Sequence, residues 1–225
     1  MKSIVLLSGG ADSATCLAKS IQKYGKENVR AINIHYGQKH SKEIDCAKKI
    51  AEYYDIPIEF FDLATVMKGS DCPLLEGQGE IMHKSYAEQM KTGPHTVETY
   101  VPFRNGLMLS IATARALVHG CDTVCYGAHS DDACGSAYPD CTPEFYESMG
   151  RAIYEGSGHK VTLEAPLLFL NKVGVIREGL ALKVPYELTW SCYEGGDEPC
   201  HECGTCIDRE NAFKLNGVTD PLCRE

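Results

Sequence analysis

Apolar runs of strand length alternate with helix-length segments along most of this chain, and this alternation limits the folds open to it. The runs stand at Ile4–Leu7, Val29–Ile34, Ile58–Phe61, Val124–Tyr126 and Val161–Leu163. Helices are expected at Ser13–Tyr24, with Ser13 as an N-cap, and at Ser41–Tyr54, Asn105–His119, Pro143–Tyr154 and Asn171–Leu182. The alternation predicts an α/β fold with a doubly wound, mostly parallel sheet, whose ligands bind beyond the carboxyl ends of the strands.

The length of 225 residues is sufficient for one domain with a core of its own. We therefore expect a single domain over residues 1–225, with no metal or disulfide needed to build its core. The stretch Ala64–Thr99 has little periodicity and several glycines, which indicates an active-site flap or an insertion. From about Tyr193 the composition turns to Gly, Pro and Cys, which predicts a small knuckle appended to the sheet.

The charge balance is acidic, with 31 Asp and Glu against 22 Lys and Arg and a formal net charge of −9 at pH 7. Long-range attraction to a polyanion such as tRNA is therefore unfavourable, and we expect a small-molecule substrate and no direct nucleic-acid partner. The run Ile4–Leu7 is too short for a signal peptide, and no segment approaches the roughly 20 apolar residues of a membrane span. We expect a cytoplasmic protein without membrane contacts.

The stretch VLLSGGADSA, residues 5–14, carries the first candidate site. A strand that ends at Leu7 and a helix that starts near Ser13 place this turn at a helix N-terminus, where unpaired N–H groups and the helix dipole favour an anion. Gly9 and Gly10 have no Cβ, so the backbone can approach phosphate oxygens closely. The turn predicts a phosphate cradle without a Walker A motif. A plain polar turn is the alternative for an isolated Gly-Gly pair.

Four of the 12 cysteines crowd into SCYEGGDEPCHECGTC, residues 191–206. Their C-x₇-C-x₂-C-x₂-C spacing predicts a closed tetrahedral set around one structural Zn²⁺, with the ligands Cys192, Cys200, Cys203 and Cys206. Four sulfurs suffice, so His201 is expected outside this set. The alternative is a C-x₂-C pair that acts as a redox or sulfur-carrying nucleophile. The other cysteines show no metal spacing, and most are expected to be buried as small hydrophobic residues.

Two motifs at opposite ends of the chain resemble those of the PP-loop ATP pyrophosphatases. S-G-G-x-D-S stands at Ser8–Ser13, and L-x-K-x-x-V stands at Leu170–Val175 with Lys172 as its cation. Enzymes of this group split ATP between its α and β phosphates and transfer AMP to a substrate oxygen. The resemblance implies the adenine nucleotide alpha-hydrolase-like fold with a small zinc knuckle at 192–206. It also implies an ATP-binding set of Leu7, Ser8, Gly9, Gly10, Ala11, Asp12, Ser13, Ala14, Thr15, Cys16 and Leu17.

Four further stretches narrow the resemblance to the 7-cyano-7-deazaguanine synthase family of queuosine biosynthesis. They are HYGQKHSKEI from His35, YVPFRN from Tyr100, GAHSDDACGSAYPDCTPEF from Gly127 and TWSCY from Thr189. This resemblance covers roughly residues 3–213. It implies ATP-dependent conversion of 7-carboxy-7-deazaguanine and ammonia to the nitrile, Mg²⁺ bridging the phosphates, and a homodimer.

The resemblance also implies roles for single residues. Lys172 and Arg104 are the candidates for stabilising phosphate charge as it develops, and Asp12 either shapes the loop or reaches Mg²⁺. The substrate-binding candidates are Tyr138, Asp140, Asp131, Gln38 and His40.

Tyr138 and Asp140, with Asp131 or Asp132, are expected to read the guanine-like edge of the substrate, because a carboxylate accepts paired N–H donors. A solvated loop is the alternative for these acidic residues. His40 or Glu43 contacts nucleotide or substrate, or else the residues after the second strand form a polar helix N-terminus.

Three other functions are compatible with parts of this sequence. A PP-loop enzyme that thiolates or ligates tRNA is disfavoured by the acidic balance and by the absence of a Lys/Arg-rich tail. Transfer of the activated deazapurine acyl group to a different amine would use the same loop, and it stays open. A zinc-knuckle binding module on an inactive nucleotide fold predicts nucleic-acid binding without ATP cleavage.

Overall fold

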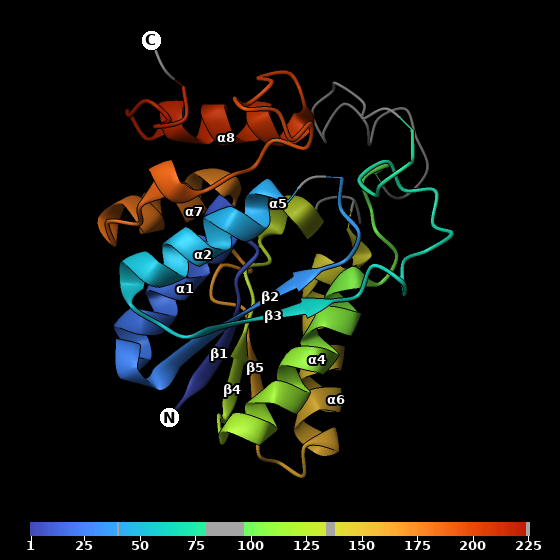
Figure 1. Ribbon diagram of the computed structural model, residues 1–225. Helices are drawn as coiled ribbons and strands as arrows, with labels where there is room; N and C mark the ends of the chain where they lie inside the picture. The colour runs from blue at the N-terminus through green and yellow to red at the C-terminus, as the bar shows by residue number, and fades with distance from the viewer. Residues whose placement is uncertain (40, 80–96, 134–137, 224–225) are drawn as a thin grey trace.

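A parallel sheet in the order β3-β2-β1-β4-β5 forms the centre of the computed structural model, which describes residues 1–39, 41–79, 97–133 and 138–223. The strands span Ser3–Leu6 (β1), Val29–His35 (β2), Ile58–Asp62 (β3), Thr123–Cys125 (β4) and Thr162–Glu164 (β5). Each predicted apolar run forms a strand to within one residue at each end, and the α/β fold is confirmed (Figure 1).

Helices cover both faces of this sheet. They are α1 (Ala11–Tyr24), α2 (Lys42–Tyr54), α4 (Arg104–His119), α5 (Ser130–Ala133), α6 (Pro143–Gly156), α7 (Lys172–Ala181) and α8 (Gly204–Leu215), with 3-10 turns at Lys26–Asn28, Pro139–Cys141 and Tyr186–Leu188. Figure 1 shows α1, α2 and α7 on one face, α4 and α6 on the other, and α8 as an outer layer over α7. Within the described ranges, no helix combines the length and the apolar character that crossing a bilayer requires.

Alternating side chains of the strands build two cores. On β1, Val5 packs into the core beneath α1, α2 and α7, whereas its neighbour Ile4 packs into the core beneath α4 and α6. All three layers therefore depend on strands that are apolar on both faces, as is usual in a parallel sheet.

Two details of the helices differ from the sequence prediction. The N-cap of α1 is Gly10 and not Ser13, because the tight turn at the two glycines lets the helix begin at Ala11. The Ser13 hydroxyl instead donates to the Gly10 carbonyl at 3.0 Å. The predicted knuckle runs into a helix that was not predicted, α8, which starts at Gly204 and buries Ala212 and Phe213 against the core.

The order of the strands places a topological switch point between β1 and β4. The loop after β1 leads to α1, while the loop after β4 leads to α5, and the two loops meet. A Cβ added at Gly127, just after β4, would lie 3.1 Å from the Asp12 carbonyl oxygen. A crevice at the carboxyl ends of these two strands is the usual ligand site of such a sheet.

Candidate active site

The backbone of the glycine loop takes a conformation that requires Gly9. Its φ is +104°, and an added Cβ would lie 2.1 Å from the carbonyl oxygen of Glu43 in α2. The Gly9 carbonyl accepts a hydrogen bond from the Trp190 backbone N–H at 3.0 Å. The loop is thus held between α2 and the segment that leads to the cysteines. No other residue type fits at this position without moving one of them.

Hydrogen bonds to two side-chain hydroxyls and from one side-chain amide fix the backbone of the glycine loop at the start of α1. The Ser13 Oγ accepts from the Gly9 N–H at 3.3 Å, and the Ser8 Oγ accepts from the Gly10 N–H at 3.2 Å. The buried Asn33 amide donates to the Leu7 and Ser8 carbonyls at 2.8 and 3.2 Å. Backbone N–H groups and hydroxyls are therefore gathered at a helix N-terminus, which is the donor set that a phosphate takes.

Apart from Gly9, the predicted ATP-binding set divides into two parts in the structure. Its members that line a cavity are Leu7, Ser8, Gly10, Asp12 and Ser13. Those buried in the helix and in the core around it are Ala11, Ala14, Thr15, Cys16 and Leu17. The first group presents polar groups to the cavity, while the second fixes α1 to the sheet.

The carboxylate of Asp12 meets the ammonium of Lys172, although the two residues are 160 positions apart in sequence. The Lys172 Nζ donates to both Asp12 oxygens at 2.7 Å. α7 begins at Lys172, where Asn171 caps the helix by accepting from the Gly174 N–H at 2.9 Å. Burial would raise the pKa of Asp12, but Lys172 and then His129 outweigh it and hold the pKa well below its usual range. The two PP-loop motifs thus form one charged site.

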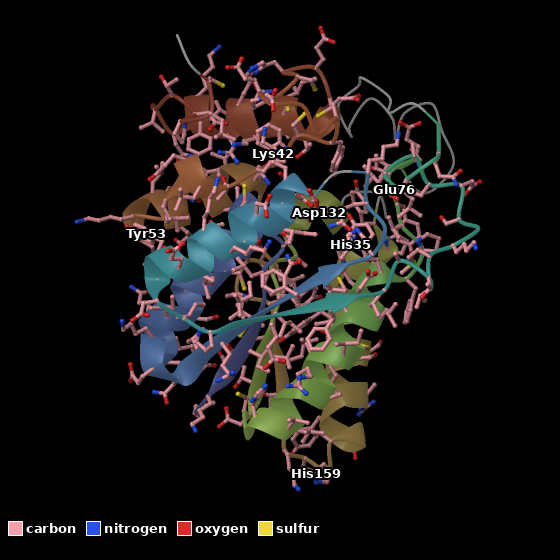
Figure 2. The ribbon with its side chains drawn as sticks, viewed as in Figure 1. His35, Lys42, Tyr53, Glu76, Asp132 and His159 are labelled. Carbon is pink, nitrogen blue, oxygen red and sulfur yellow. The ribbon has the colours of Figure 1, made fainter. Side chains whose placement is uncertain are left out.

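Two adjoining cavities, of about 150 and 220 Å³, lie above this ion pair. The side chains common to both belong to Asp12, Arg104, Asp132, Cys141, Tyr193 and Thr205. Figure 2 labels His35, where β2 ends, and Lys42, where α2 begins. Asp132 lies at this same end of the molecule, and His159 lies at the opposite end. The cavities therefore occupy the expected edge of the sheet.

Arg104, at the start of α4, and Tyr138 also line these cavities. The Arg104 guanidinium donates to the Tyr36 hydroxyl at 2.9 Å and lies 5.0 Å from the centroid of that ring. Tyr138 is buried, and its hydroxyl lies 2.6 Å from the Thr99 hydroxyl. Arg104 lines both cavities and Tyr138 lines the smaller one. The structure thus brings a cation and an aromatic wall to the site.

The other substrate-binding candidates are placed differently. The Asp131 carboxylate lines the smaller cavity and accepts from the Lys172 backbone N–H at 2.7 Å. The Gln38 side chain lines the larger cavity and accepts from the Tyr36 N–H at 2.9 Å. Asp140 is 3% exposed and lines neither cavity, because its carboxylate accepts from the Asn105 N–H at 2.8 Å near the start of α4. His40 lies outside the described residues.

Sequence reasoning assigned no role to four residues that line the smaller cavity: His129, Tyr193, Thr205 and Asp208. The His129 Nε2 lies 3.4 Å from Asp132 and 3.7 Å from Asp12. Burial opposes its charge, but Asp132 and then Asp12 raise the pKa of His129. Burial also raises the pKa of Asp132. The sequence signals for His129 were its place in the stretch GAHSDDACGSAYPDCTPEF and its position just after β4, at the switch point.

The four cysteines of the predicted zinc set come together. The sulfurs of Cys192, Cys200, Cys203 and Cys206 all lie within 4.8 Å of one another. Backbone N–H groups of Cys200 and Cys203 donate to the sulfurs of Cys192 and Cys200, each at 3.3 Å. The His201 side chain contacts Glu210 and is not one of this set. Four thiols so gathered fit one tetrahedral metal ion.

Comparison with known proteins identifies close relatives along nearly the whole chain. The family model described as queuosine biosynthesis protein QueC matches residues 2–217. The chain is 43% identical over 223 residues to the 7-cyano-7-deazaguanine synthase of Archaeoglobus fulgidus, which covers 99% of this chain and 90% of that protein. It is 40% identical over 222 residues to the 7-cyano-7-deazaguanine synthase of Caldicellulosiruptor bescii, with 99% and 96% covered.

Solved structures resemble this one in fold. NMN synthetase from Francisella tularensis superposes with a TM-score of 0.53 at 15% identity, covering 97% of this chain and 78% of that one. The U34-tRNA thiolase NcsA from Methanococcus maripaludis, solved with its [4Fe-4S] cluster, gives 0.50 at 18% identity, covering 96% and 67%. At these identities the likeness shows a shared fold of the PP-loop type.

Proposed function

The chain belongs to the queuosine biosynthesis protein QueC family, and from this premise we propose that it converts 7-carboxy-7-deazaguanine and ammonia to 7-cyano-7-deazaguanine with ATP. The observation that carries this proposal is the Lys172–Asp12 pair beside the glycine loop. This ion pair joins the two motifs of an ATP pyrophosphatase in the wall of the smaller cavity.

The reaction requires two activations at one carbon atom. A carboxylate is a poor electrophile at neutral pH, because its oxygen is a poor leaving group. Transfer of AMP to that oxygen, with release of pyrophosphate, makes it a good one, and ammonia then displaces AMP to give the amide. A second adenylation, on the amide oxygen, lets AMP leave again as the nitrile forms. One phosphate cradle serves both rounds.

The residues at the cavity floor have distinct roles in this proposal. The N–H groups and hydroxyls of Ser8–Ser13 bind the departing pyrophosphate. Lys172 and Arg104 offset negative charge as it develops, and Asp12 holds Lys172 in place. Mg²⁺, when bound with the nucleotide, supplies further charge compensation. The Asp208 carboxylate in the smaller cavity would offer it an oxygen ligand of the type that it prefers.

The smaller cavity suits the deazapurine. Its carboxylates, Asp131 and Asp132, can accept the paired N–H donors of a guanine-like edge, and the Tyr138 ring provides a flat apolar wall. We propose that Asp140 acts indirectly, because its carboxylate fixes the start of α4, from which Arg104 reaches the cavity.

The product distinguishes this function from its alternatives. With ¹⁵N-ammonia and carboxydeazaguanine labelled with ¹⁸O in the carboxyl group, mass spectrometry is expected to find a ¹⁵N-nitrile without ¹⁸O. Two AMP and two pyrophosphate should appear for each nitrile. An amide that keeps one ¹⁸O as the end product, ADP in place of AMP, or turnover independent of the deazapurine would contradict the proposal.

Transfer of the acyl group to a different amine remains an alternative, because the activating motif does not specify the acceptor. It predicts deazapurine-dependent AMP release without a requirement for ammonia. The tRNA-modifying alternative is not favoured by the names of the close relatives.

We propose one structural Zn²⁺ held by the four gathered cysteines, since thiolates are the ligands that zinc prefers in closed sites. Replacing the fully buried Cys203 with serine is expected to abolish zinc binding and to lower the midpoint of thermal unfolding by about 5–10 °C. Elemental analysis and calorimetry measure both effects. Cys121→Ser is the control, because Cys121 is 4% exposed and lies outside both groups of possible metal ligands among the described residues.

Elemental analysis also distinguishes zinc from an iron–sulfur cluster, which the solved tRNA thiolase contains. A colourless protein with one zinc per chain is expected. A brown protein with iron and sulfide would contradict the zinc proposal.

We further propose that the protein is cytoplasmic and forms a homodimer. Sedimentation measurements on the full chain test the oligomeric state.

A further inference from the structure

The Glu43 side chain, in the first turn of α2, lines the larger cavity together with the glycine loop. The loop fixes its position, since the Glu43 carbonyl oxygen lies where a Cβ of residue 9 would be. Ser8 and Gly10 line the same cavity. Glu43 therefore lies in the wall of the cavity that the glycine loop also lines, next to the place where the acyl adenylate is proposed to form.

Among the residues that the structure describes, the Glu43 carboxylate forms no hydrogen bond or ion pair. The charged or titratable groups around it are Arg104 from α4, Tyr36 after β2 and Cys46 on its own helix, while Asp12 and Tyr193 line the same cavity. Burial raises the pKa of Glu43 to about 7, although Arg104 acts in the opposite direction. At neutral pH such a group takes up and releases protons readily.

The proposed reaction releases protons at each step. Ammonium loses one proton before its nitrogen can attack the acyl carbon and a second as the neutral amide forms. The amide nitrogen then loses both of its remaining protons as the nitrile forms. Every hydrogen of ammonium thus leaves as a proton, and a general base beside the reacting carbon is required.

We propose that Glu43 is the proton acceptor for ammonia and for the amide nitrogen, an inference that rests on the proposed function. In the first round its carboxylate takes one proton from ammonium and, after passing it to solvent, a second from the nitrogen that has attacked the acyl carbon. The C–N bond forms, the C–O bond to AMP breaks, and AMP departs with the electron pair. In the second round it takes one N–H proton as the amide oxygen is adenylated and the last N–H proton as the C–O bond breaks and the carbon–nitrogen triple bond forms. Each proton then passes to solvent.

The other carboxylates near the larger cavity are already engaged. Asp12 is paired with Lys172, Asp140 accepts from Asn105, and Asp132 lies beside His129. Glu43 is the carboxylate of the larger cavity, in the described part of the chain, whose oxygens have no partner. Because its carboxylate has no partner among the described residues, we assign the proton transfer to Glu43.

The test separates adenylation from proton removal. Glu43→Gln keeps the size of the side chain and removes the base. The exchange of labelled pyrophosphate into ATP that depends on carboxydeazaguanine, measured without ammonia, is expected to stay within about threefold of wild type. Nitrile formation from the amide is expected to fall about 10²- to 10⁴-fold. Glu52→Gln, at an exposed position on the same helix, is the matched control and should leave both rates unchanged.

The dependence on pH provides a second measurement. For the wild type, kcat/KM for nitrile formation from the amide should fall as the pH drops below about 7, because protonated Glu43 cannot accept a proton. This acidic limb should be absent in Glu43→Gln. The defect of the variant in amide formation should shrink at high pH, where free ammonia becomes abundant, while its defect in the nitrile step should persist.

Each outcome decides between roles. Equal loss of exchange and nitrile formation in a folded Glu43→Gln would show that Glu43 binds nucleotide or substrate, and would overturn the proposal. So would a fully active variant, or an acidic limb that remains in Glu43→Gln. If the wild type itself shows no exchange that depends on carboxydeazaguanine, the proposed function fails, which is a different result.

Discussion

Lys172→Met is expected to lower the rate of pyrophosphate release about 10³-fold, with the protein still folded. Lys172 is the cation held directly against the glycine loop, and methionine retains its length without its charge. The lost ion pair is expected to cost about 1–3 kcal/mol of stability, less than a fully buried pair, because the Asp12 side chain is 28% exposed. Rapid-quench measurement of pyrophosphate and calorimetry determine the two effects.

A second ion pair between the same helices provides the control. Lys19 and Glu178 join α1 to α7 at 2.6 Å, as Asp12 and Lys172 do, but away from the cavities. Lys19→Met is expected to leave the rate within about twofold, as surface ion pairs contribute little. In the double variant Asp12→Asn with Lys172→Met, the rate should remain low. Its recovery would show that Lys172 serves only to neutralise Asp12.

Gly9→Ala is expected to destabilise the protein by about 2–4 kcal/mol. Alanine resists a φ of +104°, and its Cβ would lie 2.1 Å from the Glu43 carbonyl oxygen, so the loop or α2 must move. A shift of about 1 Å in the loop should reduce adenylation about 10²-fold. Denaturant unfolding and pyrophosphate exchange measure the two effects.

Gly10→Ala is the matched control for stability. Gly10 has φ −81°, and a Cβ there would meet its nearest neighbours, Ser8 and Trp190, at an ordinary 3.5 Å. We expect its stability to stay within about 1 kcal/mol of wild type. A Gly9→Ala protein that unfolds like Gly10→Ala and retains full exchange would show that this backbone conformation is not required.

The sheet was predictable because its strands are apolar on both faces, which makes each of them stand out as a short run between helices. The two motifs predicted that Lys172 supplies a cation to the glycine loop, but they did not predict its ion pair with Asp12. The helix α8 was missed because Cys206 and charged residues interrupt its apolar pattern, and its stability comes from buried contacts such as Phe213. Local pattern does not report such contacts.

The substrate side of the site was harder to predict for a different reason. His129, Tyr193 and Asp208 come from separate segments that only the folded chain brings to one cavity. Asp140 stands beside a buried tyrosine in sequence, yet its carboxylate turns away from the cavities to bind the Asn105 N–H. Sequence motifs identify which residues stand near a site, but the direction of each side chain depends on the packing around it.

The hydrogen bond from the Trp190 backbone N–H to the Gly9 carbonyl connects the glycine loop to the segment that leads to the four cysteines. Cys192, the first of the four gathered thiols, lies two residues beyond Trp190, and the Trp190 indole N–H donates to its carbonyl at 2.8 Å. A metal ion held by these thiols would therefore support the Trp190 side of the larger cavity. If ATP binds at the glycine loop as proposed, its affinity should fall when a chelator removes that metal.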